Sequence, residues 1–287
     1  MALAPGHTSL AKRASPARGG GESLHSIPSA AEPSLFCAVH LRAESQRFSY
    51  NPLPMTLAAL VDPMDWSPVR ISIETSVTAT VITLAIGLAA AAWRERRRGL
   101  GAALVDGLFL LPLVLPPTVV GFLLLLLFGR NGPVGKLLLH FGATIVFSWP
   151  ATVIAAAVVS FPLMYLTVRA ALEQVDSRFL EAARTLGASE WRVFREIALP
   201  LAWPGVLAGT ILSFARALGE FGATLMLAGN IPGRTATIPI AIYFAVESDD
   251  MNRAFAWCAI DVVISLALLA GLYHWTRAQG RARWMRR

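Results

Sequence analysis

Apolar runs long enough to cross a membrane alternate with short basic segments over most of the chain after residue 70. Five such runs stand out, at about 71–93, 104–128, 151–169, 201–226 and 254–276. A transmembrane helix needs roughly 20 predominantly apolar residues, so each run is predicted to span the membrane. A sixth apolar stretch, residues 238–246, is too short to span and is predicted to be a re-entrant or surface segment.

The basic residues between the runs predict how the helices are oriented. Fourteen of them follow the first run, separate the third from the fourth, or follow the fifth, whereas the opposite loops hold four. Basic residues favour the cytoplasmic side, so the N-terminus is predicted outside and the C-terminus inside. An even number of spans would split the basic clusters across the membrane.

The composition agrees with an integral membrane protein. The chain has 287 residues, of which 55% are hydrophobic and 15% charged, whereas soluble proteins carry about 25% charged residues. The predicted fold class is therefore all-α, a polytopic bundle of about five membrane helices. The net charge of +7 lies mostly in clusters beside the apolar runs, which orient helices and need no nucleic acid.

The cysteines and the N-terminal region add two further predictions. Only Cys37 and Cys258 are present, too few for a disulfide framework or a metal-ligand cluster, and Cys258 is predicted to pack as a small core residue. Residues 1–63 hold seven of the eighteen prolines and are predicted to be a disordered low-complexity extension. Translation starting at Met64, or at Met55, would remove the need to export this segment.

The stretch EAARTLGASEWRVFREIALP, residues 181–200, lies in the longest predicted cytoplasmic loop, at about 170–200. Asp176 or Ser177 is suited to cap a first helix, and Gly187 stands where that helix needs a left-handed residue. Ser189 is suited to cap a second helix, with Trp191, Phe194 and Ile197 as an apolar stripe. These helices form either a docking element for a partner or a surface helix on lipid headgroups.

This stretch resembles the EAA motif of permeases from binding-protein-dependent ABC importers. The motif is Glu-Ala-Ala, three residues, Gly, nine residues, then Ile-x-Leu-Pro. The matching residues are Glu181, Ala182, Ala183, Gly187, Ile197, Leu199 and Pro200. The resemblance extends over about residues 64–287, the predicted permease domain, and is greatest to molybdate-transport permeases. Residues 1–63 have no counterpart in the family pattern.

The resemblance implies a type I ABC importer permease fold in the cell inner membrane and a set of partners. These are a second permease copy, a cytoplasmic ATPase dimer coupled through the EAA loop, and an extracytoplasmic oxyanion-binding protein. The chain has no phosphate-binding Gly-x-x-x-x-Gly-Lys-Ser/Thr loop, and its only lysines are Lys12 and Lys136. The chain is therefore predicted to be non-catalytic and to bind no cofactor itself, the partner subunit using the ATP.

Several residues within the runs are candidates for the translocation path or its gate. Pro112, Pro116 and Pro117 are predicted to kink the second run, which suits a helix lining a cavity, and Gly121 to allow close helix approach. Arg216 and Glu220 stand four apart on the fourth run and are predicted to pair. That pair is either a pathway element or a neutralising pair that fixes helix packing. Four further ionisable residues are predicted to be interfacial, namely Glu74, Asp106, Asp261 and His274.

The sequence alone leaves functions other than a molybdate permease possible. A sulfate or thiosulfate ABC permease shares the EAA loop, and tungstate resembles molybdate in charge and size. A secondary carrier is disfavoured by the odd number of runs and the absence of a visible repeat. A membrane-embedded enzyme is disfavoured because no metal-spaced set of His, Asp and Cys is present.

Overall fold

The computed structural model describes residues 65–95 and 99–284, without the side chains of Glu95, Leu269 and residues 272–284. The predicted extension over residues 1–63 and both candidate later starts, Met55 and Met64, lie outside the described residues. So do the side chains of His274 and of most of the first and last basic clusters. The described residues all belong to one compact unit.

The described residues are helical throughout, without strands, as the hydropathy pattern predicts. The helices are α2 (Ser67–Glu95), α3 (Leu100–Val114), α4 (Pro117–Phe128), α5 (Pro133–His140), α6 (Trp149–Glu173), α7 (Ser177–Thr185), α8 (Glu190–Val193), a π-helical turn (Phe194–Ala198), α9 (Leu199–Leu218), α10 (Gly222–Ala228), α11 (Ile238–Glu247) and α12 (Met251–Trp284).

Four helical segments of the described chain are long and apolar enough to cross a membrane. They are Ser67–Arg94, Trp149–Glu173, Glu190–Leu218 and Met251–Leu268. A fifth candidate is the pair α3 and α4, which meet at an angle of 114°. The prediction of about five spans is confirmed in this form.

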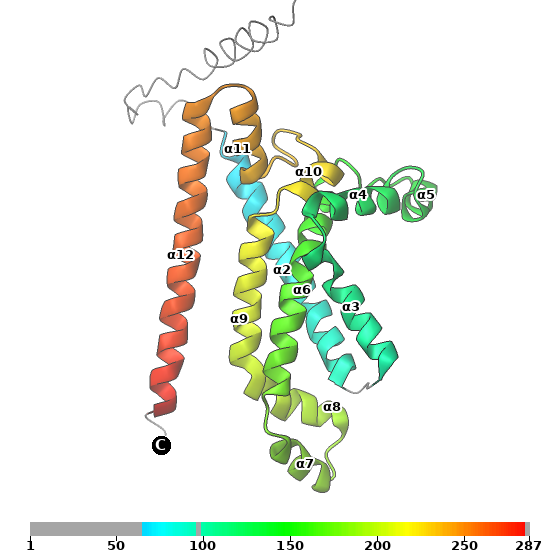
Figure 1. Ribbon diagram of the computed structural model, residues 1–287, viewed down its shortest axis with the longest axis vertical. Coiled ribbons are helices and arrows are strands. Elements are labelled where there is room, and N and C mark those ends of the chain that lie inside the picture. The colour runs from blue at the N-terminus through cyan, green and yellow to red at the C-terminus, as the bar shows by residue number, and fades with distance from the viewer. Residues whose placement is uncertain (1–64, 96–98, 285–287) are drawn as a thin grey trace, which may run out of the picture. The chain divides into compact units, whose positions relative to one another are not determined.

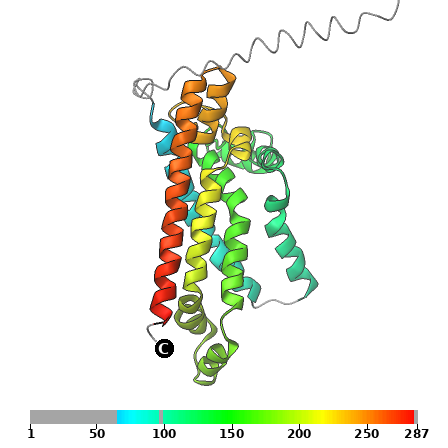
Figure 2. The same cartoon turned by 60° about the vertical axis from the view of Figure 1, so that its left-hand side comes forward.

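The centre of the bundle consists of α2, α6 and α9, which pack against one another, while α3 and α12 lie on opposite sides of them (Figure 1, Figure 2). Glycines allow the close approach. A Cβ on Gly87 of α2 would lie 2.8 Å from Met164 Cγ of α6, and one on Gly205 of α9 would lie 2.4 Å from Ala171 Cβ of α6. Small residues of this kind let membrane helices approach closely enough for extensive van der Waals contact.

The two ends of the bundle differ. One end carries α7 and α8, next to the described end of α12, and the other carries α11 and the start of α2 (Figure 1). The Ile238 backbone N–H donates to Ser72 Oγ at 2.8 Å, which fixes the start of α11 against α2. The short apolar stretch at 238–246 is therefore part of the ten-residue helix α11. This helix packs against the start of α2 and is too short to span, as predicted.

Two predicted spans differ from the structure in a way that matters for the site. The run at 104–128 is bent at Leu115–Pro116, which confirms the kink predicted from its prolines, and forms two helices. The run at 201–226 is also interrupted, because α9 ends at Leu218 and residues 222–228 form the separate helix α10. This second break was not predicted. Cys258 is exposed, so its predicted place in the core is wrong.

Candidate functional site

The loop between α6 and α9 begins with a helix whose start is set by one side chain. The Asp176 carboxylate accepts the Arg178 backbone N–H at 3.0 Å and caps α7. Leu180 and Ala183 of α7 are buried against the bundle, whereas Phe179 and Ala182 face outward. The helix therefore has one face anchored to the membrane helices and one face free for contact.

A tight turn joins α7 to α8. Gly187 has φ of +81°, a left-handed conformation that favours glycine, and its N–H donates to Arg184 O at 2.9 Å. Ser189 Oγ then accepts the Arg192 backbone N–H and caps α8. Across the turn, Arg184 Nε lies 2.8 Å from Glu190 Oε1. The predicted capping residues and the left-handed glycine are all confirmed.

From Glu190 onward, α8, the π-helical turn and α9 form one continuous helix. The Leu199 N–H donates to Phe194 O, five residues back, and Pro200 has no N–H to donate. The wider π-helical turn thus allows the helix to continue through Pro200, although this residue donates no backbone hydrogen bond. The membrane-spanning helix therefore begins at Glu190, before the apolar run predicted at 201–226. α8 is consequently continuous with a membrane span.

The motif residues divide between the surface and the core of this loop. Glu181, Ala182, Gly187 and Pro200 are exposed, Ala183 is buried, and Ile197 and Leu199 are partly buried. Beside them lie large exposed apolar side chains. Leu186 is 88% exposed and Trp191 64%, and Trp191 stacks on Phe194 at 5.9 Å between ring centroids. A rigid, locally capped hairpin with exposed apolar side chains is suited to bind a partner.

The predicted path residues lie at the two breaks in the membrane helices. Pro112 is inside α3, Pro116 precedes α4, and Pro117 is the first residue of α4. Proline lacks the N–H that would continue the helix, so the chain bends here. Gly219 follows α9 at the other break, and Gly222 begins α10.

The two breaks are neighbours in space. A Cβ on Gly222 would lie 3.2 Å from Pro117 Cβ, and one on Gly121 would lie 2.7 Å from Ala223 Cα. The start of α4 thus packs against the start of α10, and the close approach predicted for Gly121 is confirmed. We refer to this region, residues 115–121 and 216–223, as the break level.

Arg216 and Glu220 form the predicted ion pair, with Arg216 Nη2 2.7 Å from Glu220 Oε2. Glu220 lies past the end of α9, however, and not on its face. Its side chain is 2% exposed, and its Oε1 accepts the Ala223 backbone N–H at 2.8 Å. The glutamate therefore links the end of α9 to the start of α10.

An ionic cluster around Asp106 was not predicted. Asp106 Oδ2 of α3 lies 2.7 Å from Arg94 Nε of α2 and 2.9 Å from Arg169 Nη1 of α6, and Tyr165 Oη donates to Asp106 Oδ1 at 2.5 Å. The Asp106 side chain is largely buried, so it fastens α3 to the bundle and is not simply interfacial. A single acidic residue in an apolar run whose flanks carry arginines is the signal that could have revealed it.

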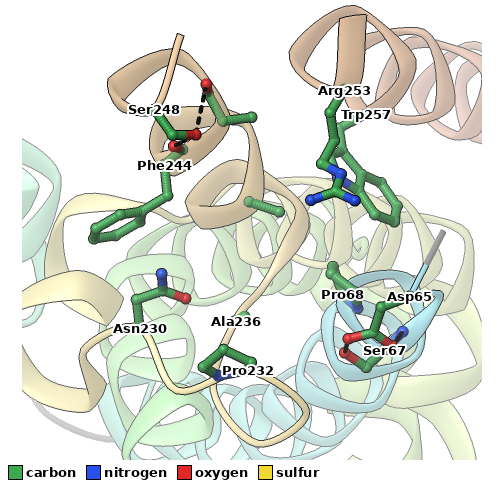
Figure 3. Close-up of a pocket in the computed structure, with 12 residues that line it drawn as sticks. Asp65, Ser67, Pro68, Asn230, Pro232, Ala236, Phe244, Ser248, Arg253 and Trp257 are labelled. Atoms are coloured by element: carbon green, nitrogen blue, oxygen red, sulfur yellow. Dashed lines mark hydrogen bonds between the residues drawn. The ribbon is translucent and has the colours of Figure 1, made fainter. Parts of the chain in front are cut away.

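At the α11 end, a cleft of about 280 Å³ lies between the start of α2, the loop after α10, α11 and the start of α12 (Figure 3). Asp65 and Arg253 are its charged residues, with Phe244 and Trp257 as its aromatic ones. Hydrogen bonds from the Ser67 side chain and backbone lower the pKa of Asp65. Among the described residues, no group of three or more His, Cys, Asp or Glu is placed to hold a metal ion.

Residues 82–275 match the family described as binding-protein-dependent transport system inner membrane component. The chain belongs to this family, and is accordingly a multi-span inner membrane component of a transport system. It is 48% identical to the molybdenum transport system permease protein ModB of Escherichia coli (strain K12), covering 74% of this chain and 92% of that protein. It is 46% identical to the putative molybdenum transport system permease protein YvgM of Bacillus subtilis (strain 168), covering 71% and 90%.

A sulfate transport system permease protein, CysT of Escherichia coli (strain K12), is 34% identical over 73% of this chain and 76% of its own length. Solved structures share the fold. An amino acid ABC transporter matches with a TM-score of 0.55 at 23% identity, covering 75% of this chain and 94% of that chain. A bacterial alginate ABC transporter, solved with a substrate-bound periplasmic protein, matches with a TM-score of 0.59 at 16% identity, covering 85% and 94%. The predicted ABC importer permease fold is confirmed.

Proposed function

We propose that this protein is the permease subunit of an ATP-driven importer for molybdate, with tungstate as a chemically similar substrate. The observation that carries the proposal is the identity of 46% and 48% to two molybdenum transport permeases over 90% and 92% of their lengths. The broken membrane helices support a translocation role, since irregular backbone at membrane depth is tolerated where it is buried in protein or lines a cavity.

The α7–α8 hairpin is the proposed coupling element. The helix around Glu181–Gly187 would fit a groove on a cytoplasmic ATPase, and the motif residues Ile197, Leu199 and Pro200 would join it to the membrane helix. The exposed Leu186 and Trp191 supply the apolar contact, and the continuous helix from Glu190 to Leu218 transmits the movement. The basic residues near this end favour a cytoplasmic position, with the N-terminus outside and the C-terminus inside.

Three partners complete the proposed transporter. A second copy of the chain would form a homodimer with the pathway between the copies, lined in part by Pro112, Pro116 and Pro117. A separate ATPase dimer would hydrolyse the ATP, because this chain has no P-loop sequence; we propose no cofactor in the permease itself. An extracytoplasmic oxyanion-binding protein would dock at the α11 end, where the cleft of Figure 3 opens.

Sulfate is the second candidate substrate. The observation favouring it is the 34% identity to a sulfate transport permease, which is lower than the identity to the molybdenum permeases. A secondary carrier and a membrane-embedded enzyme are both disfavoured, because the chain belongs to the family of binding-protein-dependent transport components.

The test is uptake by the complete transporter in liposomes, with ATP inside and the binding protein outside. Molybdate and sulfate are supplied separately at equal concentrations. We expect molybdate uptake that requires hydrolysable ATP and is insensitive to a proton uncoupler. Sulfate uptake without molybdate uptake would overturn the substrate assignment, and uptake driven by the proton gradient would overturn the ATP-driven mechanism.

A further inference from the structure

Arg216 lies inside the membrane bundle, in the last turn of α9. Its neighbour Ala217 packs in one cluster with Ala79 of α2 and with Val153 and Ala156 of α6. Ala79 is near the middle of α2, about 18 Å along the helix axis from the first residue, whereas Val153 and Ala156 lie in the first turns of α6. The Arg216–Glu220 pair therefore lies inside the bundle, beside the middle of α2 and at the end of α9.

One side of the Arg216 side chain is not covered by the rest of the chain. The side chain is 28% exposed, whereas Glu220 is 2% exposed. Ala215 and Gly219 beside it are small and exposed, and Leu212, one turn earlier, is 43% exposed. A guanidinium that faces lipid inside the bilayer is unfavourable, so we expect this face of α9 to border water or protein and not lipid.

Glu220 holds the guanidinium from the buried side. One carboxylate oxygen is 2.7 Å from Arg216 Nη2, and the other accepts the Ala223 N–H of α10 at 2.8 Å. The hydrogen bond at Oε1 thus holds the Glu220 carboxylate in place, while Oε2 meets Arg216 as an ion pair without a hydrogen bond. A guanidinium carries five N–H donors, so the pair leaves donors on the open side for another acceptor. The fixed carboxylate also offsets the positive charge.

We infer that Arg216 contacts the tetrahedral oxyanion as it passes the break level, and that Glu220 positions Arg216 and keeps this contact weak. The inference rests on the proposed function. Guanidinium binds planar pairs of oxygens through two parallel hydrogen bonds, and such contacts are strong. A permease has to release its substrate, and a buried carboxylate on the same guanidinium lowers the net charge that the dianion meets.

The first experiment replaces Arg216 in the complete transporter with ATPase and binding protein. Arg216→Gln is expected to lower the rate of molybdate uptake at least tenfold, and Arg216→Lys to retain more of it. The control is Arg70→Gln, because Arg70 forms the same i, i+4 pair with Glu74 at 2.7 Å but is 78% exposed at the α11 end. Uptake by Arg216→Gln equal to that of the control would overturn the inference.

The second experiment separates charge from packing. In a Cys37→Ser, Cys258→Ser background, Arg216→Cys is treated with a positively or a negatively charged methanethiosulfonate. The cationic reagent is expected to restore uptake at least fivefold and the anionic one not, and molybdate is expected to slow the reaction. Equal restoration by both reagents, or a thiol that neither reaches, would overturn the inference. Failure of the wild-type transporter to import any oxyanion would instead overturn the proposed function.

The third experiment tests Glu220. In Glu220→Gln the amide oxygen still accepts the Ala223 N–H, so α10 keeps its cap while the negative charge is lost. We expect KM for uptake and kcat both to fall severalfold, because the oxyanion is held longer at a more positive site. An unchanged or raised KM would contradict the positioning role of Glu220.

Discussion

The α7–α8 hairpin and the break level both hold residues of functional interest, yet they are built in opposite ways. The hairpin turns its apolar side chains outward, with Leu186 88% exposed, and is shaped by its own caps at Asp176 and Ser189. The break level turns its charge inward, with Glu220 2% exposed, and is shaped by contacts between α4, α9 and α10. The contrast fits the two proposed roles, in which the hairpin binds a partner and the break level lines the pathway.

The largest effect is expected at the break level, from Gly121→Leu. A Cβ at this position would lie 2.7 Å from Ala223 Cα, which is backbone and cannot move aside. We expect a loss of about 1–3 kcal/mol in stability together with nearly complete loss of uptake. Thermal unfolding of the purified protein and liposome uptake provide the measurements. Gly107→Leu on α3, where nothing lies within 4 Å, is the control; equal behaviour of the two variants would contradict the close contact of α4 with α10.

A smaller but specific effect is expected in the hairpin from Gly187→Val. No atom lies within 4 Å of an added Cβ, so only the left-handed backbone opposes the substitution. A β-branched residue in this conformation costs at least about 1–2 kcal/mol. We expect normal membrane insertion, thermal stability lowered by no more than this strain, continued ATP hydrolysis, and uptake reduced roughly tenfold.

Asparagine tolerates the left-handed region better than valine does. Gly187→Asn should therefore keep most of the uptake. This variant distinguishes the effect of backbone strain from the effect of losing the glycine itself. Normal transport by Gly187→Val would show that the turn is not needed for coupling.

The smallest effect on the permease itself is expected from removing the exposed apolar side chains of the hairpin. Leu186→Ala and Trp191→Ala should change its thermal stability by less than about 0.5 kcal/mol. Each should weaken binding of the ATPase subunit by about 1–2 kcal/mol, or roughly tenfold. A titration of labelled permease in detergent with the ATPase measures this. Leu104, a similarly exposed leucine on α3, provides the control, and Leu104→Ala should leave the affinity unchanged. An equal loss of affinity in this variant would show that the ATPase does not bind specifically to the hairpin.

The hairpin was predictable from the sequence because its determinants are local. Asp176, Gly187 and Ser189 each act on backbone groups within five residues, so their positions in the chain suffice. The five apolar runs were predictable for the same reason, since composition alone decides whether a helix suits the membrane.

The break after α9 and the Asp106 cluster were not predictable in the same way, whereas the prolines predicted the break between α3 and α4. A run of apolar residues gives no sign that α9 stops at Leu218, because residues 222–228 are as apolar as those before them. The Asp106 cluster joins α2, α3 and α6, and its partners Arg94 and Arg169 are 12 and 63 residues away in sequence. Such contacts depend on how the helices pack, which the order of residues along one helix does not reveal.

The central claim is that a separate ATPase binds the α7–α8 hairpin on the cytoplasmic side of the membrane. It is tested most directly by placing a photocrosslinking amino acid at Leu186 and, for comparison, at Leu104, in membranes that contain the complete transporter. The account predicts that position 186 captures the ATPase subunit and position 104 does not. Capture of no ATPase from position 186, or labelling of that position by an impermeant reagent added outside the cell, would contradict it.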